Sequence, residues 1–203
     1  MSSTVARSER VLAIDPGTQV VGFACVERSI AGPAGRVANS ATPVALRASN
    51  VVRSGRSGRS RVLIADALRL GRGASLASRL ARLQEALEEW ISEYQPQLVA
   101  IEEAFCGRSI QSALRIGEAR GVVLGTAGRH RIEVREFAPA RIKRAVTGSG
   151  RADKDQVATM VCQAFGIERP KAPADATDAL AVALCCLEAE RSIEAGLGGS
   201  SSR

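Results

Sequence analysis

Short apolar runs near the start of the chain predict two strands joined by a tight turn. Residues 11–15 read Val-Leu-Ala-Ile-Asp and stop at Pro16-Gly17, and residues 20–27 form a second apolar run. From residue 29 to 73 the pattern loosens, although the pieces 43–47 and 62–65 are compatible with strands. Between them lies a low-complexity basic stretch, 53–61. We therefore expect a long Arg/Gly/Ser-rich insertion within about 29–73.

Helical and extended patterns alternate in the rest of the chain. One apolar stripe predicts a helix over about 75–94, capped by Ser75 and followed by Pro96: Leu76, Leu80, Leu83, Leu87 and Ile91. The next expected elements are a strand at 97–103, a helix at 109–128, a strand at 131–137, and helices at 139–146, 153–165 and 175–190. This order predicts one mixed α/β domain over 11–190. Residues 1–10 are expected to form a polar tail and 191–203 a disordered one.

Composition narrows the class of protein. Apolar residues make up 45% of the chain and aromatic residues only 3%, so the core must be aliphatic. No apolar run approaches the roughly 18 residues of a membrane span, and no secretory signal precedes the first strand. The 5 cysteines are irregularly spaced, which indicates reduced thiols in a cytoplasmic protein. A net charge of +7 favours a polyanionic partner such as nucleic acid.

Four carboxylates stand at the ends of expected elements. Asp15 ends the first strand, Glu102 lies in the strand at 97–103, and Asp175 and Asp178 begin the last helix on one face. An acid at the end of an apolar strand is unfavourable unless it is paired, and a divalent metal is the usual partner. Convergence of all four would suit two-metal phosphoryl transfer, with magnesium-dependent hydrolysis of a phosphodiester as the leading hypothesis.

Each carboxylate also has a structural interpretation. Asp15 before Pro-Gly is typical of a turn, and Glu102 beside Glu103 is typical of a solvated strand end. Asp175 is a plausible N-cap, and Asp178 is an acid that the helix dipole favours. The combination on one α/β topology favours the metal site over these separate explanations.

At these residues the chain resembles the bacterial RuvC family of Holliday-junction resolvases, members of the ribonuclease H-like superfamily. The resemblance covers about 11–26 and 95–187. It rests on six segments: Ile14-Asp15-Pro16-Gly17, Ala100-Ile101-Glu102, Ser112-Ala113-Leu114, Gly117-Glu118-Ala119-Arg120-Gly121, Lys154-Asp155-Gln156-Val157 and Ala174-Asp175-Ala176-Thr177-Asp178-Ala179-Leu180. It implies a ribonuclease H-like fold, with a central five-stranded mixed sheet flanked by helices.

The resemblance also implies residue roles and chemistry. The four carboxylates would bind Mg²⁺, two ions per active site, with Mn²⁺ as a substitute. Lys143 and Lys154 would lie near the scissile phosphate, where Lys154 would stabilise the phosphoryl charge or position the water. Phe105 would stack in the opened junction centre, and Arg108 would contact the backbone. Ser109 stands where many relatives carry asparagine.

At the level of the whole enzyme, the resemblance implies a homodimer that nicks four-way junction DNA symmetrically. The products would carry 5′-phosphate and 3′-hydroxyl ends. The RuvA–RuvB branch-migration complex would be a partner, and the protein would be cytoplasmic and associated with the bacterial nucleoid, not with a membrane.

Three other functions remain open. Ribonuclease H-like folds also serve RNA-processing nucleases and transposases. Asp15-Pro16-Gly17-Thr18 resembles the first phosphate loop of actin-like ATPases, but that fold needs a second domain and a second phosphate motif. A non-cleaving DNA-binding scaffold would not need all four carboxylates. Of the remaining features, Gly117, Gly121 and Gly125 predict the close approach of another element, and His130 is expected to be structural.

Overall fold

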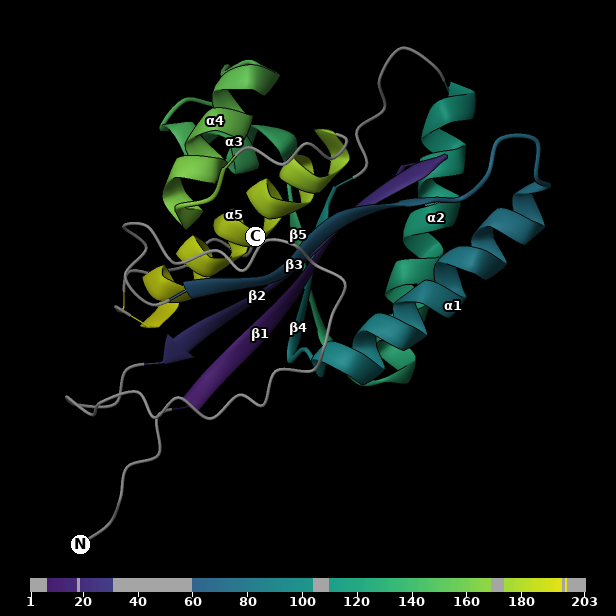
Figure 1. The fold of residues 1–203 in the computed structure, drawn as a ribbon, viewed down its shortest axis with the longest axis horizontal. Helices are drawn as coiled ribbons and strands as arrows, with labels where there is room; N and C mark the ends of the chain where they lie inside the picture. The colour runs from purple at the N-terminus through teal and green to yellow at the C-terminus, as the bar shows by residue number, and fades with distance from the viewer. Residues whose placement is uncertain are drawn as a thin grey trace, which may run out of the picture.

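Five strands and five helices make up the described part of the chain in a computed structural model (Figure 1). The structure describes residues 7–17, 19–30, 60–103, 110–168, 174–194 and 196. The elements are β1 (Arg7–Asp15), β2 (Val20–Ile30), β3 (Ser60–Arg69), α1 (Leu76–Tyr94), β4 (Leu98–Glu102), α2 (Ile110–Arg129), β5 (Glu133–Phe137), α3 (Pro139–Thr147), α4 (Lys154–Phe165) and α5 (Ala174–Glu194).

The strands form one mixed sheet in the order β3-β2-β1-β4-β5. β1, β2 and β3 pair antiparallel as a meander, whereas β1, β4 and β5 run parallel. β1 is the central strand, and Val11 to Ile14 are fully buried because helices cover both faces of the sheet. A strand buried on both faces reads as a continuous apolar run, which is why 11–14 was recognisable in the sequence.

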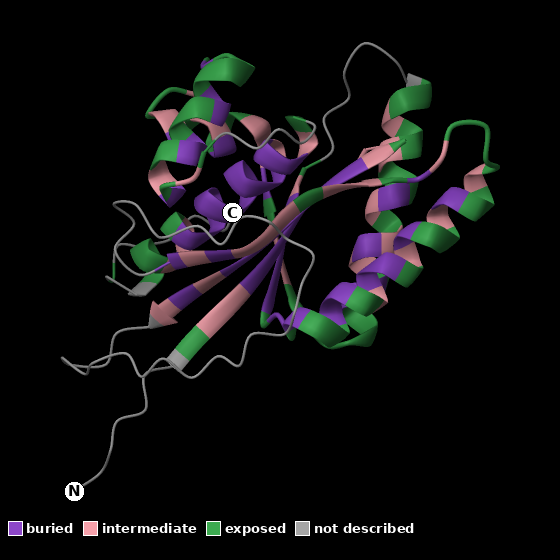
Figure 2. Ribbon diagram, viewed as in Figure 1, coloured by how far each residue is buried: buried purple, intermediate pink, exposed green. Residues whose placement is uncertain are grey.

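Two layers of helices enclose the sheet (Figures 1 and 2). Leu12 and Ile14 point toward α1 and α2, and Val11 and Ala13 point toward α5. α5 lies across the sheet with α3 and α4 packed on its outer side, so the segment 179–187 is buried throughout. This double cover explains why the segment 179–187 of α5 is apolar on every side.

The predicted fold class is confirmed, and the differences lie at element ends. β1 begins at Arg7, inside the expected tail of residues 1–10. Charged side chains extend this strand because they pair across it: Arg28 with Glu9 at 2.6 Å, and Arg10 with Glu27 at 3.0 Å. At the other end of the chain α5 continues to Glu194, into the stretch expected to be a disordered tail.

The expected insertion within 29–73 contains an edge strand of the sheet. β3 spans Ser60–Arg69, longer than the predicted piece 62–65. Arg61, expected in the basic loop, belongs to this strand and donates to Glu27 Oε2 at 2.9 Å. The other arginines of that loop, Arg53, Arg56 and Arg59, lie outside the described residues, as does the piece 43–47.

Three smaller predictions have clear outcomes. Ser75 caps α1 as expected, with its Oγ accepting from the Ser78 backbone N–H at 3.1 Å. His130 lies on the surface directly after α2, where its ring pairs with Glu88. Apart from the neighbouring residues of α2 itself, no atom of the described chain lies within 4 Å of a Cβ built on Gly117, Gly121 or Gly125, so the predicted close approach is absent within the described residues. None of the helices in the described ranges is long and apolar enough to cross a membrane.

Candidate active site

Two of the four carboxylates meet at the end of the parallel strand pair. Asp15 is the last residue of β1 and Glu102 the last of β4, and Ile14 lies opposite Ile101 in the parallel register. Side chains alternate along a strand, so Asp15 shares the α5 face with Val11 and Ala13. Glu102 shares that face for the same reason. The strands therefore bring two acids side by side under α5.

The first turn of α5 brings Asp175 and Asp178 to the same ends of β1 and β4. Gly22 makes this approach possible. Gly22 lies opposite Asp15 in the β1–β2 pair. A Cβ built on Gly22 would lie 1.9 Å from the Asp175 carbonyl oxygen, far inside contact distance. Only glycine lets the α5 backbone approach the strand this closely. The helix start is thus seated directly on β2, next to Asp15.

These elements enclose a cavity of about 200 Å³ between the strand ends, α3, α4 and α5. Its lining residues are Asp15, Glu102, Pro139, Ile142, Lys143, Lys154, Val157, Asp178 and Ala181. Pockets for whole small molecules usually measure about 300–1,000 Å³, so this cavity suits a smaller group such as one phosphodiester with its waters. Asp175 lies beside the cavity and does not line it.

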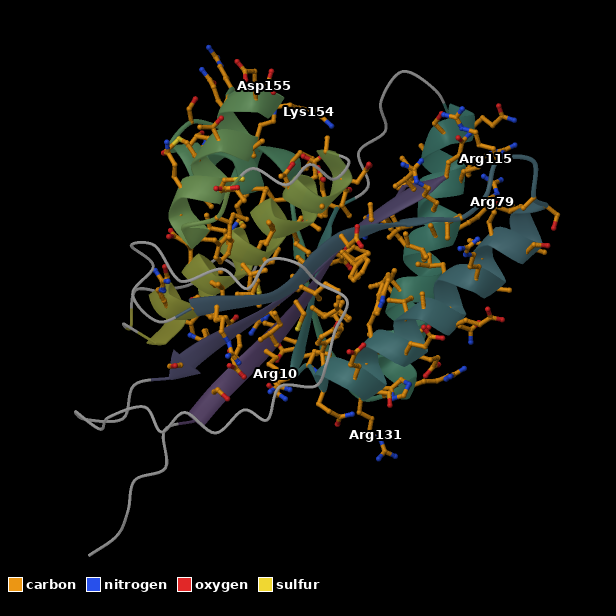
Figure 3. The ribbon with its side chains drawn as sticks, viewed as in Figure 1. Arg10, Arg79, Arg115, Arg131, Lys154 and Asp155 are labelled. Atoms are coloured by element: carbon orange, nitrogen blue, oxygen red, sulfur yellow. The ribbon has the colours of Figure 1, made fainter. Side chains whose placement is uncertain are left out.

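Lys154 and Lys143 supply the positive charge of the cavity. Lys154 begins α4, where Asp153 and Gln156 form a capping box that fixes the helix start. Its Nζ lies 3.1 Å from Asp178 Oδ2, and the rest of the side chain is exposed at the top of the molecule (Figure 3). The pKa of Lys154 is raised, chiefly because its ammonium donates to Asp178.

The cavity concentrates more negative charge than its lysines neutralise. Burial and then the neighbouring carboxylates of Glu102, Asp178 and Asp175 raise the pKa of Asp15 to about 7, against the lowering effect of Lys154. Burial followed by Asp178 also raises the pKa of Glu102. Crowded acids of this kind are stabilised by a bound cation.

Arg120 of α2 ties the end of β4 in place from the opposite face of the sheet. Its Nη1 donates to the Glu102 carbonyl oxygen, and its Nη2 pairs with Glu136 of β5. The guanidinium also lowers the pKa of Glu102, although less than burial and Asp178 raise it. One half-buried arginine therefore holds the backbone of Glu102 and weakly favours the charged form of its carboxylate.

The donor set fits a hard divalent cation by residue type. Magnesium prefers a few carboxylate oxygens together with waters and substrate phosphates, and this cavity offers the carboxylates of Asp15, Glu102 and Asp178. No group of three or more His, Cys, Asp or Glu side chains in the described ranges is already arranged to hold a metal ion. The Lys154 ammonium instead lies against Asp178, where it offsets part of the negative charge.

Comparison with known proteins decides the family. The family model of crossover junction endodeoxyribonuclease RuvC matches residues 43–186, a range that contains Glu102, Asp175 and Asp178. The chain belongs to the RuvC family. The RuvC of Halorhodospira halophila is 40% identical over 176 residues, covering 87% of this chain and 88% of that protein.

Solved RuvC structures share the fold. Thermus thermophilus RuvC superimposes with a TM-score of 0.70 at 27% identity, covering 90% of this chain and 95% of that one. The same protein in complex with a Holliday junction substrate gives a TM-score of 0.68 at 25% identity, with the same coverage of both chains. The expected ribonuclease H-like, five-stranded architecture is therefore confirmed for this RuvC-family chain.

The site contains residues that sequence reasoning selected and residues that it missed. Asp15, Glu102, Asp178, Lys143 and Lys154 line one cavity, whereas Asp175, the fourth carboxylate expected to converge there, lies beside it. Phe105 and Arg108 lie outside the described residues. Gly22 and the position of Arg120 were missed. A glycine inside an apolar strand was a usable signal of close approach, whereas the Arg120 contacts depend on how α2 packs behind β4.

Proposed function

We propose that this chain is a crossover junction endonuclease that resolves four-way DNA junctions. The observation that carries the proposal is the cavity at the ends of β1 and β4. There the carboxylates of Asp15, Glu102 and Asp178 lie beside Lys143 and Lys154. Its size suits one phosphodiester. The RuvC relatives are named crossover junction endodeoxyribonucleases, and one of them has been solved with a Holliday junction.

The proposed cofactor is Mg²⁺, two ions per site, with Mn²⁺ able to replace it. Asp15, Glu102, Asp175 and Asp178 would hold the metal, and the raised pKa of Asp15 supports this assignment. When bound, the metal supplies Lewis-acid activation of water and of the phosphate. Cation binding would also free Lys154 from its contact with Asp178.

The reaction is hydrolysis of one phosphodiester bond per strand. The oxygen of a water molecule forms a bond to phosphorus as the bond between phosphorus and O3′ breaks, and the leaving O3′ takes up a proton. The products are a 5′-phosphate and a 3′-hydroxyl. Lys154 and Lys143 contact the phosphate oxygens, and their charge stabilises the added negative charge of the transition state.

The proposed enzyme acts as a homodimer, so that two sites nick two strands symmetrically. We assign the dimer contact to the glycine face of α2, defined as Leu114, Gly117, Gly121 and Gly125. Leu114 is 64% exposed, although it is a large apolar residue. Open space faces the three glycines, which suits the close approach of a second α2 helix.

The remaining proposed contacts follow from the family. Phe105 stacks in the opened centre of the junction, and Arg108 contacts the DNA backbone. The RuvA–RuvB branch-migration complex is the proposed partner on the junction, in the bacterial cytoplasm at the nucleoid. The nuclease domain is proposed to span 11–190, extended at its start by the Arg7 end of β1.

A cleavage assay tests this function. Purified protein is mixed with a mobile synthetic four-way junction or with a linear duplex of the same sequence, each with Mg²⁺ and with EDTA. The expected result is paired symmetric nicks in the junction alone and only with Mg²⁺. Cutting of the duplex at the same rate would refute junction selectivity, and binding of the junction without cutting would leave only a scaffold function.

A further inference from the structure

A hollow lined by arginines lies on the other face of the sheet from the catalytic cavity. Three arginines from different elements line it, together with Gln19 and the glycine-containing turn 71–73. Arg72 belongs to the connection between β3 and α1, Arg79 to α1 and Arg115 to α2. The proposed function does not use any of these residues.

No carboxylate is among the described residues that line this hollow. Seven other arginines of the described chain pair with carboxylates: Arg10, Arg28, Arg61, Arg120, Arg129, Arg135 and Arg191. Arg72 and Arg115 form no such pair with any described residue. Like charges that converge without a counter-charge are unfavourable until an anion binds between them.

Local backbone structure adds to the positive potential. The hollow includes Gly73 and Ala74, immediately before Ser75, the N-cap of α1. The first turn of α1 contains no acidic residue. The partial positive charge of a helix start therefore adds to three guanidinium groups. Guanidinium groups bind phosphate through two parallel hydrogen bonds, which makes a phosphate group the best-matched ligand.

The hollow is placed to meet the same DNA as the catalytic cavity. Gln19 follows the turn that begins at Asp15, and its carbonyl oxygen accepts from Leu70 N–H at 2.8 Å, which holds the β3–α1 connection against that turn. Arg79 and Arg115 lie at the same end of the molecule as Lys154 but beside α1 and α2, whereas Arg131 lies at the opposite end (Figure 3). The arginine-lined hollow and the catalytic cavity thus lie on opposite faces of the sheet at the same end of the molecule.

We infer that Arg72, Arg79 and Arg115 bind a phosphate of the DNA backbone while the catalytic cavity holds the scissile one. The inference rests on the proposed function, because it takes the bound polymer to be junction DNA. The DNA would pass over the ends of the central strands. The catalytic cavity would hold it on one face of the sheet and the arginine-lined hollow on the other. This second contact would fix the orientation of the DNA over the cavity without contacting the reacting phosphate.

The test is the salt dependence of junction binding in EDTA, where cleavage does not interfere. Affinity for a fluorescent four-way junction is measured by anisotropy across a range of KCl concentrations. The variants are Arg72→Ala, Arg115→Ala and the double variant, because both side chains are exposed and their removal leaves the core intact. Arg131→Ala is the matched control, since it removes the same charge at the far end.

Each lost phosphate contact lowers the magnitude of the slope of log K against log salt by about 0.9. We expect that loss for each single variant, about twice that loss for the double variant, and the wild-type slope for Arg131→Ala. Wild-type slopes in Arg72→Ala and Arg115→Ala would overturn the inference while leaving the proposed function intact. A wild-type protein that does not bind the junction would overturn both.

Inorganic phosphate serves as a second probe. Binding of phosphate to the wild type but not to the double variant, combined with an unchanged junction slope, would assign the hollow to a free anion and refute the DNA contact. Thermal unfolding of each variant checks that the protein is folded. Arg79→Ala is left out of the primary test because Arg79 is only 8% exposed and its loss also removes packing.

Discussion

Gly22→Ala should strongly reduce the activity of the catalytic cavity although no charged residue that lines it is substituted. The added Cβ would lie 1.9 Å from the Asp175 carbonyl oxygen and 2.6 Å from its carbon, whereas real Cβ atoms keep at least 3.0 Å. The start of α5 must therefore move by more than 1 Å, or β2 must bend. Either change shifts Asp175 and Asp178 relative to Asp15.

The size of the effect follows from two general magnitudes. Overpacking of this kind typically reduces the free energy of unfolding by about 1–3 kcal/mol. A displacement of about 1 Å in a catalytic constellation can reduce the rate about 10²-fold. Junction affinity should remain near that of the wild type, because the cations that bind the backbone are not moved.

The assay is single-turnover cleavage of a four-way junction at saturating enzyme, with urea unfolding and junction binding measured in parallel. Gly128→Ala is the control, because it adds the same methyl group where no described atom beyond the neighbouring residues of α2 lies within 4 Å. Cleavage by Gly22→Ala at the wild-type rate would refute the role of this close approach. So would an equal loss of activity in Gly128→Ala.

Three further predictions concern charge and assembly. Arg120→Leu should reduce the free energy of unfolding by about 1–3 kcal/mol in a urea titration, because the Glu102 carbonyl and the Glu136 carboxylate lose their donor. The same variant should also cleave the junction more slowly. Unchanged stability and an unchanged cleavage rate would contradict this prediction. Since burial and neighbouring carboxylates raise the pKa of Asp15 from 3.8 to about 7, the unfolding free energy of the metal-free protein should fall as pH rises from about 4 to 7. Asp15→Asn should reduce this pH dependence in urea titrations in EDTA, and an unaltered profile would contradict the assignment. Gly121→Arg should convert the dimer to a monomer in analytical ultracentrifugation, and a persistent dimer would exclude the glycine face of α2.

The core of the fold was predictable because its signals are local. The buried run 11–14, the apolar stripe of α1 and the Ser75 cap of α1 each need only a few neighbouring residues to be recognised. The element ends were less predictable. β1 extends to Arg7 because Glu9 and Arg10 pair with charges on β2, and no short window of sequence contains both partners.

The candidate site likewise contains residues that local sequence predicts and contacts that it does not predict. Asp15 and Glu102 were identifiable as acids that end apolar strands, and the i, i+3 spacing of Asp175 and Asp178 placed them on one face of a helix. The contact between Gly22 and Asp175 joins residues far apart in the chain, as does the link from Arg120 to Glu102. Such contacts depend on how α5 and α2 pack against the sheet. The position of Asp175 beside the cavity, not in its lining, is another consequence of that packing.

The central claim is that the clustered carboxylates perform the cleavage and that other groups bind the DNA. The most direct measurement compares junction cleavage and junction binding by Asp15→Asn and Asp178→Asn with those of Asp155→Asn. Asp155 is an exposed acid next to Lys154 that does not line the cavity (Figure 3). The account predicts that the first two variants bind the junction but no longer cut it, while Asp155→Asn cuts normally. Cleavage by Asp15→Asn at the wild-type rate, or loss of junction binding in that variant, would contradict it.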